Sequence, residues 1–182
     1  LSTTGLVYGA LGNLNKALEH HEYAKKIYHR EKNKKGLATQ YGNIGLIYNT
    51  QGKLEEALMY HKKALEIDTE LEDHRGIATD LNNIGIVYKD KGEFEKALDY
   101  HLRALDIHRK IKDLDGEASD LGNIGSVYYE RGELDKALEY HRESLRIQRL
   151  VGDPVEGAHQ LGNIGLIYSE KGDLEVALQY HR

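Results

Sequence analysis

A histidine recurs every 40 residues along this sequence of 182 residues, and imidazole nitrogens are common zinc ligands. Ligands of one zinc ion must place their atoms within about 2.1 Å of the ion. Equivalent residues of neighbouring repeats would instead lie roughly 10 Å apart, the usual distance between packed helices. We therefore predict that these histidines pack between helices, and that the chain binds no metal or other cofactor. The five residues are His21, His61, His101, His141 and His181.

An asparagine recurs with the same spacing, and it is the best candidate for a binding role. Asparagine is a middling helix former, so its return in four copies suggests a purpose. Its amide offers two donors and an acceptor, which would suit either a ligand or a neighbouring helix. In the second case it would only fix the geometry of the array, and the sequence leaves both alternatives open. The residues are Asn43, Asn83, Asn123 and Asn163.

The motif that carries the asparagine organises the whole chain. It reads Leu-Gly-Asn-Ile-Gly-Leu-Ile-Tyr at residues 161–168. A fixed repeat of roughly 20–50 residues is typical of solenoids, which have no single central core and grow by adding units. We therefore predict an array of stacked repeats. Further copies occupy residues 41–48, 81–88 and 121–128, and a degraded copy opens the chain with Gly5 and Tyr8 in the matching places.

Each repeat is predicted to form two antiparallel helices, because apolar residues recur at helical spacing on both sides of a short connection. An Asn or Asp precedes the first helix, where its side chain can accept a hydrogen bond from a free N–H group of the first turn. A glycine follows the first helix and signals its end. The N-caps are Asn33, Asp73, Asp113 and Asp153, and the glycines are Gly12, Gly52, Gly92, Gly132 and Gly172.

These signals divide residues 1–182 into the units of a single array. The chain begins and stops part-way through a repeat, so we expect it to be a slice of a longer array. The units are residues 1–32 (partial), 33–72, 73–112, 113–152 and 153–182 (partial).

Small residues recur on both helices of each repeat. A glycine within a helix costs about 1 kcal/mol relative to alanine, so its repetition needs a reason. We expect the backbones of the paired helices to approach closely at these positions. They include Gly45, Gly85, Gly125 and Gly165 on the first helices and Ala57, Ala97, Ala137 and Ala177 on the second.

Composition excludes several classes of function. The net charge of −5 disfavours binding to nucleic acid, which needs a basic surface. The absence of cysteine excludes disulfides and thiolate metal sites and is compatible with the cytoplasm, where we place the protein. No apolar run approaches the ~18 residues of a membrane-spanning helix. No catalytic set of residues is recognisable, because every recurring His and carboxylate follows the architectural repeat. We predict that the protein is not an enzyme.

Residues at the turn between the two helices resemble the tetratricopeptide repeat signature. The usual repeat is roughly 34 residues long, and we attribute the longer period here to a second helix about two turns longer. The Leu-Gly-Asn opening and the Gly-Asp cap resemble the LGN/Pins group of this family. The resemblance implies an all-α, right-handed superhelical solenoid of antiparallel helix pairs. The matching residues of one repeat are Leu81, Gly85, Tyr88, Gly92, Phe94, Ala97 and Ala104.

The resemblance also implies a concave groove, lined by the first helices, that holds a peptide segment of a partner protein. In related arrays the recurring asparagine binds the main chain of the ligand. Other residues on the same face complete the predicted groove. They are Asn82, Thr39, Thr79, Ser119, His159, Leu46, Ile86, Leu166, Asn49, Lys89 and Tyr129.

The charge of this groove limits its ligands. Carboxylate-clamp repeats, which bind acidic C-termini of chaperones, carry Lys or Arg at these places, and members of the LGN/Pins group carry arginines along the groove. Lys89 is the only basic residue among the positions above, apart from His159. We therefore predict a neutral, apolar-anchored or mildly basic peptide segment as ligand, and not an acidic one.

The leading functional hypothesis is a non-catalytic scaffold for protein–protein interaction. A second hypothesis is a structural spacer or a rod that self-associates by stacking its end repeats. A third is a sensory or regulatory region of a larger signalling or transcriptional protein. None of the three involves nucleic acid or a membrane, and the sequence does not identify the partner.

Overall fold

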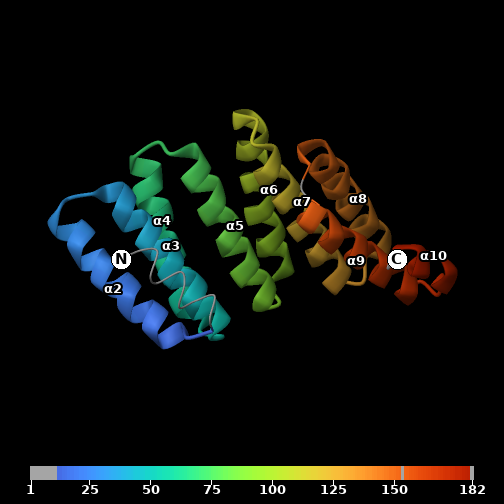
Figure 1. Cartoon of the computed structure of the whole chain (residues 1–182), viewed down its shortest axis with the longest axis horizontal. Helices are drawn as coiled ribbons and strands as arrows, with labels where there is room; N and C mark the ends of the chain where they lie inside the picture. The colour runs from blue at the N-terminus through green and yellow to red at the C-terminus, as the bar shows by residue number, and fades with distance from the viewer. Residues whose placement is uncertain (1–11, 153, 181–182) are drawn as a thin grey trace. The chain divides into compact units, whose positions relative to one another are not determined.

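Nine α-helices and no strand occur in residues 12–152 and 154–180, the part of the chain that the computed structural model describes (Figure 1). The predicted all-α repeat fold is confirmed. The chain forms two compact units, one ending at Gly92 and the other beginning at Glu93. The predictions made for Gly5, Tyr8, Asp153 and His181 concern residues outside the described part.

The first unit contains four described helices, and each packs against the next one along the chain. Figure 1 shows them in blue to green, with successive helices running in opposite directions. Their bounds are α2 (Leu14–Arg30), α3 (Lys34–Thr50), α4 (Leu54–Glu70) and α5 (His74–Asp90).

The second unit contains five described helices, again packed in chain order. They are α6 (Phe94–Ile111), α7 (Leu114–Glu130), α8 (Leu134–Val151), α9 (Pro154–Glu170) and α10 (Leu174–Tyr180).

The predicted caps define the starts of α3, α5 and α7. In each case the Oδ1 atom of the capping residue accepts a hydrogen bond from the backbone N–H of a glycine three residues later, which satisfies one free donor of the first turn. The distances are 2.8 Å for Asn33 and Gly36, 3.1 Å for Asp73 and Gly76, and 3.3 Å for Asp113 and Gly116.

The helix ends follow two different patterns. Gly52 and Gly92, which follow α3 and α5, have φ angles of 72° and 74°, as predicted for helix-ending glycines. The second helices of the repeats have no such glycine in the first unit, where Lys32 and Glu72 adopt φ angles of 55° and 53° instead. The two helices of this repeat are equally long, because α3 and α4 contain 17 residues each.

An isoleucine near the middle of each first helix lies at the centre of the core. The four residues are fully buried, and stacked tyrosines cover the core at the ends of the helix pairs. Ring centroids lie 5.4 Å apart for Tyr48 and Tyr60, and 5.4 Å apart for Tyr128 and Tyr140. The isoleucines are Ile44, Ile84, Ile124 and Ile164.

The recurring glycine on the first helix makes room for a side chain, and this corrects the reason given above for its repetition. A Cβ atom added to Gly45 would lie 2.7 Å from the ring of His61 on α4. At Gly125 the ring of His141 on α8 would lie 3.0 Å from such a Cβ atom. The paired helices therefore approach through an imidazole ring that packs on the glycine, and not through direct backbone contact.

This contact predicts opposite effects for two Gly→Ala substitutions. Gly45→Ala should lower the free energy of unfolding by about 1–3 kcal/mol, because the added methyl group overpacks the His61 ring. Gly162→Ala is the matched control within α9, where no atom lies within 4 Å of an added Cβ atom. It should raise stability by up to about 1 kcal/mol through helix propensity. Urea unfolding followed by circular dichroism measures both, and a stabilising Gly45→Ala would contradict the packing described here.

Candidate functional site

The histidines are packed between helices, as the sequence predicted. His21, His61, His101 and His141 are at most 2% exposed. The Nδ1 atom of His21 lies 2.8 Å from Oε1 of Gln40, and the Nδ1 atom of His141 lies 2.7 Å from Oε1 of Gln160. Within the described residues no group of three or more His, Asp or Glu side chains is arranged to hold a metal ion.

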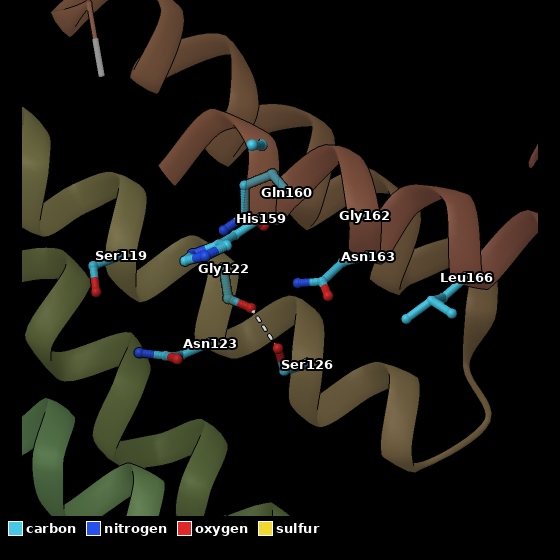
Figure 2. Close-up of a pocket in the computed structure, with 10 residues that line it drawn as sticks. Ser119, Gly122, Asn123, Ser126, His159, Gln160, Gly162, Asn163 and Leu166 are labelled. Carbon is cyan, nitrogen blue, oxygen red and sulfur yellow. Dashed lines mark hydrogen bonds between the residues drawn. The ribbon is translucent and has the colours of Figure 1, made fainter. Parts of the chain in front are cut away.

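A pocket of about 560 Å³ lies between α7 and α9 of the second unit. Asn163 and Leu166 project from α9 on the side that faces α7, and the hydroxyl of Ser126 donates to the carbonyl oxygen of Gly122 over 3.0 Å (Figure 2). The lining is small and polar, with Leu166 as its one large apolar residue. The lining residues are Ser119, Gly122, Asn123, Ser126, Ala158, His159, Gln160, Gly162, Asn163 and Leu166.

A second pocket, of about 350 Å³, lies between α3 and α5 of the first unit. Many of its residues precede their counterparts in the α7–α9 pocket by 80 positions, so the two pockets are equivalent sites of the repeat. The lining residues are Lys35, Ala38, Thr39, Gly42, Asn43, Leu46, Asp68, Asp73, Arg75, Gly76, Thr79, Asp80 and Asn83.

The two pockets bring together most of the predicted groove residues. All four recurring asparagines line one pocket or the other, and each of them is half-buried. The predicted residues one turn before the asparagines, three small ones and His159, also line the pockets, and so do two of the apolar residues one turn after them. These predicted residues are Asn43, Asn83, Asn123, Asn163, Thr39, Thr79, Ser119, His159, Leu46 and Leu166.

The amides are the hydrogen-bonding groups that these pockets can offer most freely. In the described part of the chain, the side chains of Asn43, Asn83 and Asn163 make no hydrogen bond. The hydroxyls of Thr39 and Thr79 instead donate to carbonyl oxygens of their own helices, over 3.0 Å and 2.9 Å. The threonines therefore keep only acceptor capacity for a ligand, whereas each of these amides keeps two donors and an acceptor.

Five predicted groove residues do not line either pocket: Asn82, Ile86, Asn49, Lys89 and Tyr129.

Two of these five bond instead to an acidic residue at the end of the next first helix. The Nδ2 atom of Asn49 donates to Asp90 over 3.0 Å, and the hydroxyl of Tyr129 donates to Glu170 over 2.5 Å. The periodicity placed these side chains on the groove face, but their reach lets them bond to the neighbouring helix instead.

The polar residues on the floor of the pockets were not among the predicted site residues. Asp80 and Gln160 are 4% and 6% exposed and occupy equivalent places on α5 and α9. A Cβ atom added to Gly122 would lie 2.8 Å from Nε2 of Gln160, so this side chain reaches across to α7. The available signal was a polar residue four positions before a buried isoleucine, on the core-facing side of the helix.

The floor of the α3–α5 pocket carries two coupled carboxyl groups. Burial, together with the neighbouring carboxyl of Asp68, raises the pKa of Asp80 to about 8. Burial also raises the pKa of Asp68, with a contribution from Asp73. A hydrogen bond between the two groups raises the pKa of Asp80 and lowers that of Asp68, as expected where Asp80 holds the proton and donates it.

The repeats match a known family. A family model described as tetratricopeptide repeat matches residues 1–70, 37–110 and 117–182. The chain belongs to the tetratricopeptide repeat family. No curated protein has a significantly similar sequence. None of the described helices of this tetratricopeptide array is long and apolar enough to cross a membrane.

Several solved structures share the fold of this tetratricopeptide array. BtubC from P. vanneervenii superposes with a TM-score of 0.80 at 24% identity, over 97% of this chain and 73% of that chain. A Rap protein complexed with Competence and Sporulation Factor superposes with a TM-score of 0.88 at 20% identity, over 97% of this chain and 50% of that chain. A signal transduction ATPase with a tetratricopeptide repeat sensor from Pyrococcus horikoshii superposes with a TM-score of 0.80 at 21% identity, over 98% of this chain and 28% of that chain. These identities establish the fold alone, and the chain spans only half the length of the Rap protein.

The buried titratable groups predict how stability depends on pH. Asp80 has a pKa of about 8 in the folded chain against an ordinary value of 3.8, so its contribution to stability falls as pH rises between these values. Burial lowers the pKa of His61 to about 4 from 6.5, so its contribution falls as pH drops through that range. Below pH 6.5 the two groups change stability in opposite directions as the pH varies. Above pH 6.5, of these two groups, only Asp80 still changes stability with pH.

We therefore expect the melting temperature of the wild-type chain to fall between pH 6.5 and pH 8. The free energy of unfolding should fall by about 1–2 kcal/mol over this interval, because one pKa unit corresponds to about 1.4 kcal/mol. Asp80→Asn removes the titrating group and should flatten the profile over this interval. Thermal unfolding at several pH values, followed by circular dichroism, measures both chains. Parallel profiles for the two chains would contradict the assignment of the slope to Asp80.

Proposed function

We propose that this tetratricopeptide array is a non-catalytic binding module for a peptide segment of a partner protein. The segment would lie against α3 and α5 in the first unit and against α7 and α9 in the second. The asparagine amides would bind its main chain, and the small residues beside them would leave room for it.

The recurrence of the same pocket in both units carries this proposal. Each pocket combines two asparagines, one from each first helix, with small neighbours such as Gly42 or Gly122. The half-buried amides of Asn43, Asn83 and Asn163, which make no hydrogen bond within the described residues, suit a ligand that presents N–H and C=O groups at regular intervals, as an extended peptide does. Side-chain preferences would then come from the residues that differ between the pockets.

The finer assignments rest on resemblance and composition. We propose that the chain is related to the LGN/Pins group through its 40-residue repeat, and that it acts in the cytoplasm. The α3–α5 pocket is lined by three acidic and two basic residues and the α7–α9 pocket by no Lys or Arg, which favours a neutral or mildly basic segment over an acidic one. The partner itself is identified only by this chemistry.

A second candidate is a sensory region within a larger protein. The signal transduction ATPase with a similar fold is described as having a tetratricopeptide repeat sensor, and the similar Rap protein was crystallised with Competence and Sporulation Factor. Peptide binding in the same pockets would then control another domain. A self-associating rod is the third candidate, supported by exposed apolar residues on α10 such as Leu174 and Leu178. Concentration-dependent mass in sedimentation experiments would favour the rod.

The asparagines provide the test of the binding module. Peptides would be selected from a random library on the wild-type chain, and their affinities measured by isothermal titration calorimetry. The double variant Asn83→Ala/Asn163→Ala removes one amide from each pocket. We expect binding to weaken roughly two- to tenfold for each asparagine that the peptide contacts, because one net hydrogen bond contributes roughly 0.5–1.5 kcal/mol.

The double variant Asn15→Ala/Gln179→Ala is the matched control, because it removes two exposed amides from α2 and α10, one in each unit. It should bind the selected peptides as the wild-type chain does. Circular dichroism should show equal helicity for all three chains. Equal affinities of the two double variants would mean that the asparagines serve the architecture only.

A further inference from the structure

We propose that the pocket between α3 and α5 is a subsite for an arginine side chain of the bound segment, with the guanidinium group held by the carboxylates of Asp80 and Asp68. This inference rests on the peptide-binding function proposed above and specifies its ligand. The lining residues of the equivalent pocket between α7 and α9 include no carboxylate, so that pocket would take a neutral side chain.

Asp80 lines the pocket and carries one oxygen without a hydrogen-bond partner among the described residues. Its side chain is buried, and its Oδ1 atom would lie 3.9 Å from a Cβ atom on Gly42, a lining residue of the opposite helix. The carboxyl group therefore reaches from α5 across the floor of the pocket to α3. Its Oδ2 atom has no hydrogen-bond partner among the described residues. A buried acceptor without a donor costs roughly 1–3 kcal/mol, which a donor from a ligand would offset.

Asp68 adds a second acid at the same place. Its carboxyl group shares a hydrogen bond with Asp80, and it also lines the pocket. It packs on Gly76 in the first turn of α5, where a larger residue would not fit. The free N–H groups at this end of a helix favour a negative charge. The pocket thus holds two carboxyl groups, one at the helix N-terminus and one on its floor.

The next repeat supports the inference by contrast. His108 and Asp120 occupy the places of Asp68 and Asp80 one repeat later, and Nδ1 of His108 lies 2.6 Å from Oδ2 of Asp120. That repeat supplies its buried acid with a base from the chain itself. The α3–α5 repeat supplies a second acid instead, so the histidine that pairs with the buried acid of the next repeat has no counterpart there.

The charged groups around Asp80 do not fill that role. On α3, Lys35 pairs with Asp73 over 2.8 Å, and its side chain is 77% exposed. His61 on α4 is buried, and its pKa of about 4 keeps it neutral above that pH. Arg75 on α5 is exposed, and the influences on the pKa of Asp80 are burial and Asp68 alone.

An arginine side chain matches this environment. Its planar guanidinium group has five donors in a fork that can bond to two carboxylates at once. The pocket volume of about 350 Å³ lies within the usual range of ligand pockets. On binding, the guanidinium would take the place of the proton on Asp80, which would leave to solvent.

The direct test uses N-acetyl-arginine methylamide as probe and the neutral citrulline analogue as its control. Titrations followed by two-dimensional NMR would report on the backbone amides of Gly42, Asn43 and Gly76. We expect the wild-type chain to bind the arginine probe roughly tenfold more tightly than the citrulline probe, the effect of about 1.4 kcal/mol from a charge-assisted bond. Asp80→Asn should abolish this preference, and an unchanged preference would overturn the inference.

The proton on Asp80 gives a second readout. Affinity for the arginine probe should rise with pH, by up to about tenfold per pH unit below the pKa, because binding requires the carboxylate. The rise should level off above about pH 8, the pKa of Asp80. In Asp80→Asn the affinity should not change over this range. A wild-type affinity that is independent of pH would contradict the displacement of a proton.

Two further comparisons separate the possible failures. Methylguanidine should bind more weakly than the arginine probe, and equal affinity would indicate a free small cation instead of a peptide segment. Library-selected peptides that bind regardless of Asp80→Asn would overturn the subsite and leave the peptide-binding module intact. Binding of the arginine probe without any selected peptide would overturn the module and leave the cation site.

Discussion

In the α3–α4 and α7–α8 pairs, the structure depends on an imidazole ring that packs on a glycine. The rings of His61 and His141 occupy the space that a side chain at Gly45 or Gly125 would need. This contact sets how closely the two helices of a pair approach, and it buries a polar ring completely. A buried ring must be neutral or bonded, because an ionised group without a partner is costly in the core. The His141 ring bonds to Gln160 on the floor of a pocket, so the packing contact and the candidate site share one residue.

The sequence predicted those features that repeat. Periodicity was sufficient to place the helices, the caps such as Asp73, and the face on which Asn83 lies, because each depends on local spacing. It could not decide whether Asn49 meets a ligand or bonds to Asp90, since that depends on how far a side chain reaches between helices. It also missed Asp80, because a core-facing position in a solenoid is expected to be apolar. The sequence therefore predicted which face of the first helices forms the candidate site, whereas the buried polar residues on its floor, such as Asp80, were found only in the structure.

The positions that break the repeat explain how similar units can differ in what they bind. One pair of buried positions holds Asp68 and Asp80 in the first unit, and its successor holds His108 and Asp120. The surrounding core changes little, because a fully buried isoleucine recurs beside these positions. Buried acids are a poor way to stabilise a protein, since desolvation opposes their ionisation. The Asp80 position is polar and buried in every described repeat, where the other residues are Gln40, Asp120 and Gln160, so the acid changes the charge of the site and not its polarity.

In such a site a proton can neutralise the buried acid until a ligand cation binds. In the free chain it neutralises Asp80, so the acid pair can remain buried near neutral pH without a cation. A ligand cation that enters the pocket makes this proton unnecessary, and its binding energy then stabilises the charged form that folding alone disfavours. Stability of the free chain and affinity for a cation thus depend on pH in opposite directions. This opposition distinguishes a binding acid from a structural one, because a carboxyl group that only supported the fold would have no reason to favour its ionised form when a ligand arrives.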